Sequence, residues 1–317
     1  MQSQAFLAFW GWKSLPWNEA PPSQELFWQE RTERLAQRLL FALSRAGQVS
    51  VIAAPAGHGK STFAKWLYGS LNPKEHDVAL FSLMRKSPAG DWLMQALADY
   101  LGLSSREPKD IIHHLHRSQL QGRLLTLIID EAHKLVDADA FEALFALGQV
   151  SSRIGFGLNC VLIGRPELLK TLRGISGVQH RLGLCTELQA LSPSELAAFV
   201  NYKLNAWQLG PKTLQSEALD LLMQHEIGTF AAVESVLEAC LLEAFLQEQR
   251  SISAEAMSQA LKFLGLLKSD ETAESAKGRQ ALRRRPQVPS QQRAAAAALD
   301  LNSLYYKSDD GQDPEQS

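Results

Sequence analysis

The hydrophobic and polar positions of this chain follow two alternating patterns over its first 190 residues. Short apolar runs indicate buried strands, and apolar positions three or four residues apart indicate amphipathic helices. The runs predict strands at Val49–Ala54, Val78–Leu83, Leu124–Ile129, Leu158–Ile163 and Leu182–Leu188. The helical patterns cover residues 25–46, 60–71, 91–102, 109–120 and 141–153, and a further helix begins at 166–172. This alternation predicts an α/β fold, a mostly parallel sheet with flanking helices.

Beyond residue 190 the pattern becomes helical only. Ser192 and Glu195 form an N-terminal capping signature before an apolar run, and Ser253 opens the last helix in a similar way. We therefore expect a small all-helical lid domain at 191–268. Residues 269–317 are rich in Ser, Gln, Ala, Asp and Arg and have little apolar periodicity, which predicts a disordered tail.

The break after the first predicted strand has the spacing of a P-loop (Walker A), with Ala54 in place of the first glycine. Glycines let successive backbone N–H groups face phosphate oxygens, and the helix that follows adds its dipole. We expect Lys60 to contact the β- and γ-phosphates of ATP and Ser61 to bind Mg²⁺. The expected nucleotide-binding residues are Ala54, Pro55, Ala56, Gly57, His58, Gly59, Lys60, Ser61 and Thr62.

The strongest predicted strand, Leu124–Ile129, ends in the paired carboxylates Asp130 and Glu131, which is the Walker B arrangement. Asp130 is expected to hold Mg²⁺, either through water or together with Ser61. Glu131 is expected to orient and polarise the water that attacks the γ-phosphate. The two motifs together predict hydrolysis of ATP to ADP and phosphate.

Four segments carry a further resemblance. They are the aromatic box Phe9–Trp17, the Walker B segment Asp130–Leu135, the segment Leu162–Leu168, and Gln179–Leu182. Together they resemble the AAA+ P-loop ATPases, and most of all the secretion-associated ExeA/GspA (MshM-like) family, related to the TniB/TnsC-like transposition ATPases. The resemblance spans residues 9–265 and implies a bacterial protein. It places an N-terminal aromatic and proline box at 1–24 and an AAA+ nucleotide-binding domain at 25–190.

The resemblance also implies roles for single residues. Arg165 falls in the sensor-1 region, where the family usually has Gln, and Arg181 is the candidate arginine finger that enters a neighbouring subunit's site. An ordinary surface arginine is the alternative for both, and Arg173 is the second candidate for the finger. The lid segment Gly228–Ala231 stands where the family has Gly-x-Pro-Arg, whose arginine contacts nucleotide. ATP binding is therefore expected more firmly than fast hydrolysis.

Composition bears on the partners of the protein and on its cellular compartment. The net charge of −2 gives no overall electrostatic reason for a nucleic-acid or membrane partner. Three cysteines without CxxC spacing argue against a disulfide framework or a zinc site, and we expect buried thiols in a reducing compartment. No apolar segment is long enough to predict a membrane helix, and the first residues lack the order of a signal peptide. These features predict a cytoplasmic protein.

Two segments leave alternatives open. The N-terminal tryptophans Trp10, Trp12, Trp17 and Trp28 either bind a partner or pack as a lip over the nucleotide-binding domain. The stretch Lys277–Arg293 has six basic residues and no acidic one. It could contact DNA phosphates without sequence specificity, or it could be a solvated linker or a protein-docking tail.

Three functions remain open at this point. The first is an ATPase, acting as a homo-oligomeric ring or filament, that remodels or assembles a protein complex of secretion or pilus type. The second is an ATP-dependent, DNA-binding regulator of transposition. The third is an ATP-gated assembly switch that hydrolyses slowly. The partner would be a protein client of a secretion or transposition system, and the basic stretch makes DNA a possible second partner.

Overall fold

The computed structural model describes residues 2–17, 26–45, 47–84, 92–135, 141–142, 144–145, 147, 157–175, 182–225 and 227–267. The chain falls into two units, residues 1–267 and 268–317, and the second unit lies outside the described residues. The expected tail at 269–317 therefore stays a prediction. The helix expected at 141–153 is described only in part.

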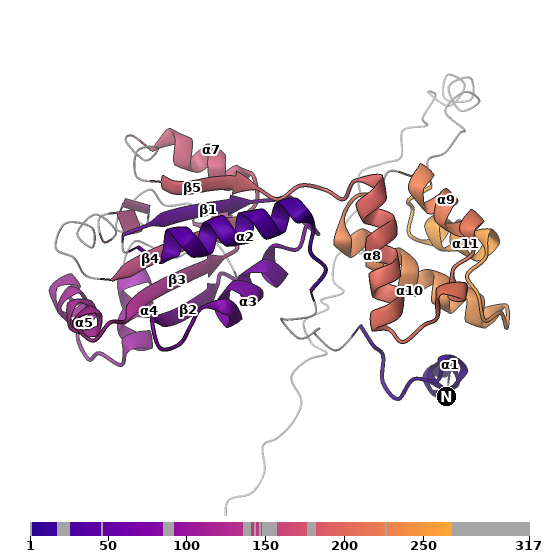
Figure 1. Ribbon diagram of the computed structural model, residues 1–317, viewed down its shortest axis with the longest axis horizontal. Helices are drawn as coiled ribbons and strands as arrows, with labels where there is room; N and C mark the ends of the chain where they lie inside the picture. Colours follow the sequence, from indigo (N-terminus) through magenta and orange to yellow (C-terminus); the bar gives the residue numbers. More distant parts are fainter. Residues whose placement is uncertain are drawn as a thin grey trace, which may run out of the picture. The chain divides into compact units, whose positions relative to one another are not determined.

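Within the described residues, five parallel strands form one sheet in the order β2-β3-β4-β1-β5 (Figure 1). Strand β1 lies between β4 and the edge strand β5 and pairs with both, with Ile52 opposite Ile163 of β4 and Thr186 of β5. The five predicted strands are confirmed. Their bounds are Val49–Ala53 (β1), His76–Ser82 (β2), Leu124–Asp130 (β3), Leu158–Gly164 (β4) and Leu182–Glu187 (β5).

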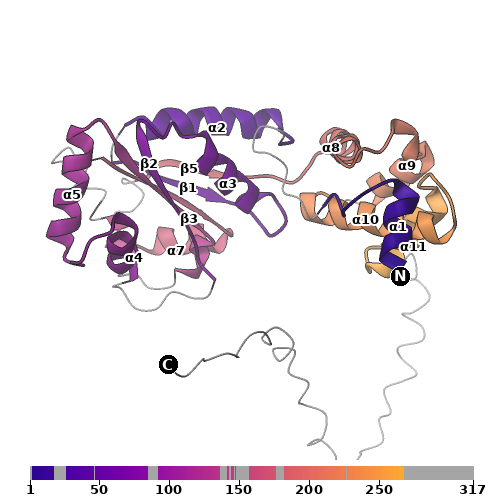
Figure 2. The same ribbon diagram turned by 90° about the horizontal axis from the view of Figure 1, so that it is seen from below.

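Helices cover both faces of the sheet. Successive side chains of a strand point to opposite faces, so Val51 and Ile52 of β1 enter two different apolar cores. The core around Ile52 is closed by α2 and α3, and the core around Val51 by α4, α5 and α7. Figure 2 shows α2 on one side of the sheet and α4 and α7 on the other. The bounds are Glu30–Leu43 (α2), Lys60–Ser70 (α3), Trp92–Leu101 (α4), Pro108–Leu120 (α5) and Glu167–Gly174 (α7).

Helix α2 begins at Glu30, later than the residue 25 expected from the pattern. Residues 26–29 are not helical, and Gln29 has an extended backbone with φ −84° and ψ 141°. The acidic residues Glu30 and Glu33 then occupy the first turn, where negative charge is favoured by the helix dipole. This later start leaves the segment before α2 free to line the site described below.

Residues 193–263 form helices α8 to α11 around a separate helical core. Their bounds are Pro193–Ala206 (α8), Ser216–Gln224 (α9), Phe230–Leu246 (α10) and Ala254–Phe263 (α11), and a short 3₁₀ turn spans Pro211–Thr213 (η4). The predicted capping box is confirmed, since Glu195 N donates to Ser192 Oγ and Ser192 N donates to Glu195 Oε2. None of the described helices is long and apolar enough to cross a membrane.

The N-terminal residues form a helix that the sequence did not predict, α1 at Gln2–Trp10. It packs on α10, and the ring centroids of Phe6 and Phe245 lie 5.5 Å apart. Beyond α1, Trp12 Nε1 donates a 2.8 Å hydrogen bond to the carbonyl oxygen of Trp207. The expectation that this aromatic segment covers the nucleotide-binding domain is therefore wrong for Trp10 and Trp12, which pack in the helical core.

The three cysteines differ in environment. Cys160 lies in a sheet core and Cys240 in the helical core, and both are buried free thiols. Burial raises the pKa of Cys240 to about 12 and lifts the pKa of Cys160 well above its usual range. Cys185 is exposed on β5, so the expectation of burial is wrong there. The reason is that β5 is an edge strand whose side chains alternate between partly buried and exposed.

The packing of α1 predicts a large effect of one aromatic truncation. Phe6→Ala should lower the free energy of unfolding by about 3 kcal/mol, because a nearly buried ring is lost from the helical core. Urea denaturation of the full chain measures this. Phe263→Ala is the matched control, since that ring is 79% exposed, and its effect should stay within about 0.5 kcal/mol. Equal stability of the Phe6 variant and the wild type would contradict the packing.

Candidate nucleotide-binding site

The loop between β1 and α3 has the backbone that the P-loop spacing requires. Gly57 and Gly59 both have φ +78°, the left-handed region that a side chain disfavours. Ala54, in place of the usual first glycine, is fully buried, and its N–H donates a 2.9 Å hydrogen bond to the carbonyl oxygen of Gly164. This residue extends the β1–β4 pairing by one step. Its methyl group packs in the core and leaves the loop undisturbed.

Lys60 is the first residue of α3 and is almost buried, with 6% exposure. Its Nζ donates a 2.7 Å hydrogen bond to the carbonyl oxygen of Pro55, within the same loop. Burial lowers the pKa of Lys60, and the nearby carboxylates of Glu131 and Asp130 oppose that effect. A desolvated ammonium group with three N–H donors at a helix N-terminus is well suited to bind a phosphate oxygen.

The carboxylates after β3 lie in distinct environments. Asp130 is the last residue of the strand and is 5% exposed, and its Oδ1 accepts a 2.8 Å hydrogen bond from Glu131 N. Glu131 has φ 59° and ψ 30°, a left-handed backbone that is uncommon for a residue other than glycine. Such strain concentrates at functional sites, and here it turns the glutamate side chain toward the cavity that it lines.

Lys134 is a neighbour of Glu131 that the sequence reasoning missed. Its Nζ lies 3.2 Å from Glu131 Oε2 and donates hydrogen bonds to the carbonyl oxygens of Leu83, at 2.7 Å, and Met84, at 3.3 Å. The lysine thus ties the glutamate to the chain that follows β2. The spacing of three residues in a tight turn was the available signal, because it brings the two side chains together.

His133 and Arg165 also lie near Glu131. The N–H of Arg165 donates to His133 Nδ1 at 3.3 Å, so the neutral ring carries its proton on Nε2, which lies 3.8 Å from Glu131 Oε2. Burial lowers the pKa of His133, so the ring is neutral at pH 7. Arg165 lines the cavity, and its expected sensor role stays a prediction.

A cavity of about 530 Å³ extends from the loop toward an aromatic wall. At this end the ring centroids of Phe27 and Phe199 lie 5.3 Å apart, and those of Phe199 and Phe230 lie 4.9 Å apart. Trp28 also lines it and packs edge-on against Trp66 of α3. The same cavity thus contains phosphate-binding groups and aromatic rings, and the Phe230 ring packs against the loop at Gly59. This combination suits a nucleotide. Further residues that line it are Trp17, Gln29, Thr32, Gly57, Gly59, Lys60, Ser61, Glu131, Tyr202, Lys203, Ala231, Glu234 and Glu238.

The start of α10 lies against the loop. The N–H of Ala231 donates a 3.2 Å hydrogen bond to the carbonyl oxygen of Gly57. Thr229 caps the helix, and its Oγ1 accepts from Ala232 N. Ala231 stands at the position where the family resemblance would place an arginine. The lid segment therefore meets the loop through its backbone and a methyl group, without a cation at that position.

A charged cluster on the helical side of the cavity was also missed. Lys203 Nζ of α8 lies 2.7 Å from Glu234 Oε1 of α10, and the lysine side chain is only 12% exposed. Burial raises the pKa of Glu238, and the neighbouring charge of Glu234 adds to that effect. Lys203, Glu234 and Glu238 are far apart in sequence or separated by a helical turn, and no motif joins them.

Comparisons with known proteins address the fold. Residues 44–172 match the family model described as "AAA domain". The ORC2 protein of Aeropyrum pernix, solved as ADPNP-ADP complexes, superposes with a TM-score of 0.57 at 19% identity, covering 73% of this chain and 66% of that one. Cdc6p of Pyrobaculum aerophilum gives a TM-score of 0.60 at 14% identity, with 76% and 69% covered. The Thermotoga maritima RuvB Holliday junction branch migration motor gives 0.50 at 18%, with 73% and 69% covered.

This chain has the AAA+ P-loop fold. It spans about two thirds of the length of these solved chains. No curated protein matches the sequence.

The candidate arginines and the Walker residues predicted from the sequence differ in what the structure shows of them. Arg181, the expected arginine finger, lies outside the described residues, as does the basic stretch Lys277–Arg293. Arg173, the second candidate, is an exposed residue of α7. The expected residues Lys60, Ser61, Glu131 and Arg165 all line one cavity, which brings the two Walker segments together.

The contact between the AAA+ loop and α10 predicts the effect of one methyl group. A Cβ at Gly57 would lie 3.2 Å from both Ala231 Cβ and Thr229 Oγ1, which is a crowded contact. The backbone φ of +78° at this position is also unfavourable for alanine. Gly57→Ala should weaken ATP binding about tenfold, measured by calorimetry. Gly102→Ala is the control. Gly102 has a similar φ of +66°, so alanine has a similar backbone cost there, but its Cβ would have no neighbouring atom within 4 Å. This variant should bind ATP normally. Equal binding by both variants would contradict the importance of the contact.

Proposed function

We propose that this protein binds ATP with Mg²⁺ and hydrolyses it to ADP and phosphate as an AAA+ ATPase. The observation that carries the proposal is the meeting of Lys60 and Glu131 in one cavity, next to the buried Asp130. Lys60 begins the helix after β1 and Glu131 follows β3, far apart in sequence, yet their charges act on one another. A chance P-loop sequence would have no reason to face a second acidic motif.

In the proposed complex, the loop N–H groups and Lys60 bind the phosphates, while aromatic rings that line the cavity, such as Phe27, pack against the base. Ser61 and Asp130 offer a hydroxyl and a carboxylate oxygen, which are ligands that Mg²⁺ prefers. When bound there, the metal ion would neutralise charge on the β- and γ-phosphate oxygens.

In the proposed reaction, Glu131 accepts a proton from a water molecule as that water attacks the γ-phosphorus. A new P–O bond forms, the bond to the β-phosphate oxygen breaks, and ADP leaves with the electron pair. Glu131 must first lose or lengthen its contact with Lys134, because an ion-paired carboxylate is a poorer base. Arg165 at the cavity, and Arg181 from a neighbouring subunit, are the proposed groups that stabilise the transition state.

Slow turnover is favoured by two observations. The lid position of Ala231 has no cation, and Glu131 is held by Lys134 in the described arrangement. An ATPase with these features would remain in its ATP state for longer. This supports the proposal that ATP binding drives assembly of an oligomer, with hydrolysis as the slower release step.

The pathway proposal comes from the resemblance to the ExeA/GspA family. It assigns the protein to remodelling or assembly of a secretion or pilus type complex through a protein client. The alternative is a DNA-dependent regulator of the TniB/TnsC kind. The basic stretch at 277–293 favours the alternative, as does the fold likeness to RuvB, whose name describes a motor on Holliday junctions.

The central experiment separates binding from hydrolysis. Lys60→Ala should weaken ATP binding roughly 10- to 100-fold, because a charge-assisted phosphate contact is lost. Glu131→Gln should bind ATP as tightly as the wild type and lower kcat by about 100-fold or more. Calorimetry gives the affinities, and phosphate release gives kcat.

Lys65→Ala is the matched control, since this lysine lies on the same helix and is exposed. It should resemble the wild type in both measurements. Light scattering of the Glu131→Gln protein with ATP tests the assembly step and should show oligomers. Unchanged ATP affinity of Lys60→Ala, or unchanged turnover of Glu131→Gln, would refute the proposed function.

DNA stimulation distinguishes the two pathways. If the alternative holds, duplex DNA at low salt should raise the ATPase rate of the full chain several-fold, and deletion of 277–293 should abolish that increase. The salt dependence should be steep, because phosphate contacts release counterions. No DNA binding at low salt would exclude the regulator and leave the protein-remodelling proposal.

A further inference from the structure

Gln29, directly before α2, has an unusual side chain. It is 4% exposed, it lines the cavity, and its Nε2 has no hydrogen-bond partner among the described residues. A buried N–H donor without an acceptor is unfavourable and calls for an explanation. A ligand acceptor in the cavity supplies one.

The orientation of this amide is fixed by its oxygen. Gln29 Oε1 accepts hydrogen bonds from Thr32 Oγ1 at 3.0 Å and from Arg31 Nε at 3.5 Å. An arginine side chain can donate but cannot accept, so a flipped amide would set two donors against each other. The oxygen therefore faces Arg31, and the two N–H groups of Nε2 are left for another partner.

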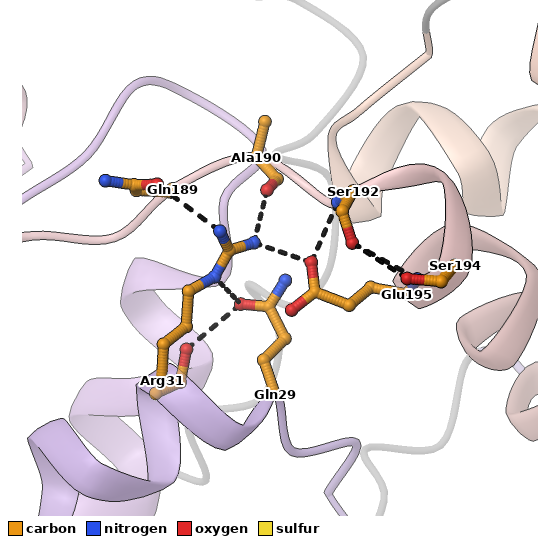
Figure 3. Close-up of polar contacts among 8 residues, drawn as sticks. Gln29, Arg31, Gln189, Ala190, Ser192, Ser194 and Glu195 are labelled. Atoms are coloured by element: carbon orange, nitrogen blue, oxygen red, sulfur yellow. Dashed lines mark hydrogen bonds and ion pairs between the residues drawn. The ribbon is translucent and has the colours of Figure 1, made fainter.

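Arg31 continues the network away from Gln29 (Figure 3). Its Nη2 donates to the carbonyl oxygen of Ala190 at 2.5 Å and to Glu195 Oε2 at 2.7 Å. Its Nη1 donates to Gln189 Oε1 at 3.3 Å. One planar guanidinium thus binds the chain that follows β5 and the first turn of α8. This use of several N–H groups is specific to arginine.

The contact between Arg31 and Glu195 connects α2 to α8, the helix that forms another wall of the cavity. Glu195 Oε2 also accepts from Ser192 N, so the same carboxylate closes the capping box of α8. Phe199 and Tyr202, four and seven residues later on α8, line the cavity. Residues at this spacing share one face of a helix with Glu195. Arg31 therefore connects the wall formed by Gln29 with the wall formed by α8.

We propose that Gln29 Nε2 donates a hydrogen bond to a ring nitrogen of the purine base, and that Arg31 is the positioning residue that presents this amide and holds α8 beside the base. The inference rests on the proposed nucleotide binding. Arg31 then contributes to the affinity for the nucleoside part of the ligand and not to the contacts with its phosphates.

The test compares ligands that share phosphates and differ in the base. ATP, ADP and inorganic tripolyphosphate are titrated into the full chain by calorimetry. Arg31→Met and Gln29→Met should each bind ATP and ADP about tenfold more weakly, because one directed hydrogen bond to the base is lost. Tripolyphosphate has no base, so its affinity should stay within about twofold of the wild type.

A double variant tests whether the two residues act as one unit. Gln29→Met with Arg31→Met should bind ATP no more weakly than the weaker single variant, because the second change removes nothing further. In both single variants KM for ATP should change by a larger factor than kcat, since the Walker residues are unchanged. Glu195→Gln, which keeps the capping box, should weaken ATP binding by a smaller factor, about threefold.

Arg34→Met is the matched control, since Arg34 lies one turn later on α2 and pairs with exposed Glu30. It should bind all three ligands normally. If Arg31→Met fails to fold, Gln29→Met and Glu195→Gln decide the matter. Unchanged ATP affinity, equal losses for ATP and tripolyphosphate, or additive effects in the double variant would overturn the inference. A wild-type chain that binds no ATP would refute the proposed function instead.

Discussion

The parallel pairing of β1 with β4 on one side and β5 on the other is the constraint on which the site depends. A strand buried on both faces and paired on both edges has no freedom to shift, so the loop that leaves it begins at a fixed place. The hydrogen bond from Ala54 N to Gly164 O extends this constraint one residue further. The left-handed glycines can then bring Lys60 to the same edge of the sheet as Asp130 and Glu131, which follow a different strand.

Much of this arrangement could be predicted from the sequence, because the signals are contiguous. Apolar runs of five to seven residues mark all five strands, and the two Walker segments follow two of them directly. Helix α1 was missed for a physical reason. Its residues Ala5–Trp10 are all apolar, so the sequence shows no contrast between the buried positions Phe6 and Trp10 and the exposed positions Ala5 and Ala8. The late start of α2 was missed because Gln29 is extended through contacts that the pattern does not contain.

The cation and amide network of the cavity could not be predicted at all. Arg31 meets Glu195 across 164 positions of sequence, and Lys203 meets Glu234 from a different helix. Each of these residues alone resembles an ordinary surface charge on an amphipathic helix. Only folding brings these partners together. Lys203 and Glu234 then line the cavity, whereas Arg31 stays exposed next to it. The absence of an arginine at Ala231, by contrast, could be predicted, because the Gly-x-Pro-Arg motif is contiguous in sequence and its replacement at 228–231 is visible there.

The unequal environments of the three cysteines give the molecule a built-in point for chemical attachment. Cys160 is enclosed in a core of the sheet and Cys240 in the helical core, and burial raises the pKa of both thiols, whereas Cys185 is exposed on the edge strand β5. It precedes Gln189 and Ala190, the chain that Arg31 binds, by only a few residues. A fluorophore coupled there would sit close to the joint between sheet and helices without any engineered residue, and would make movement at that joint visible in real time.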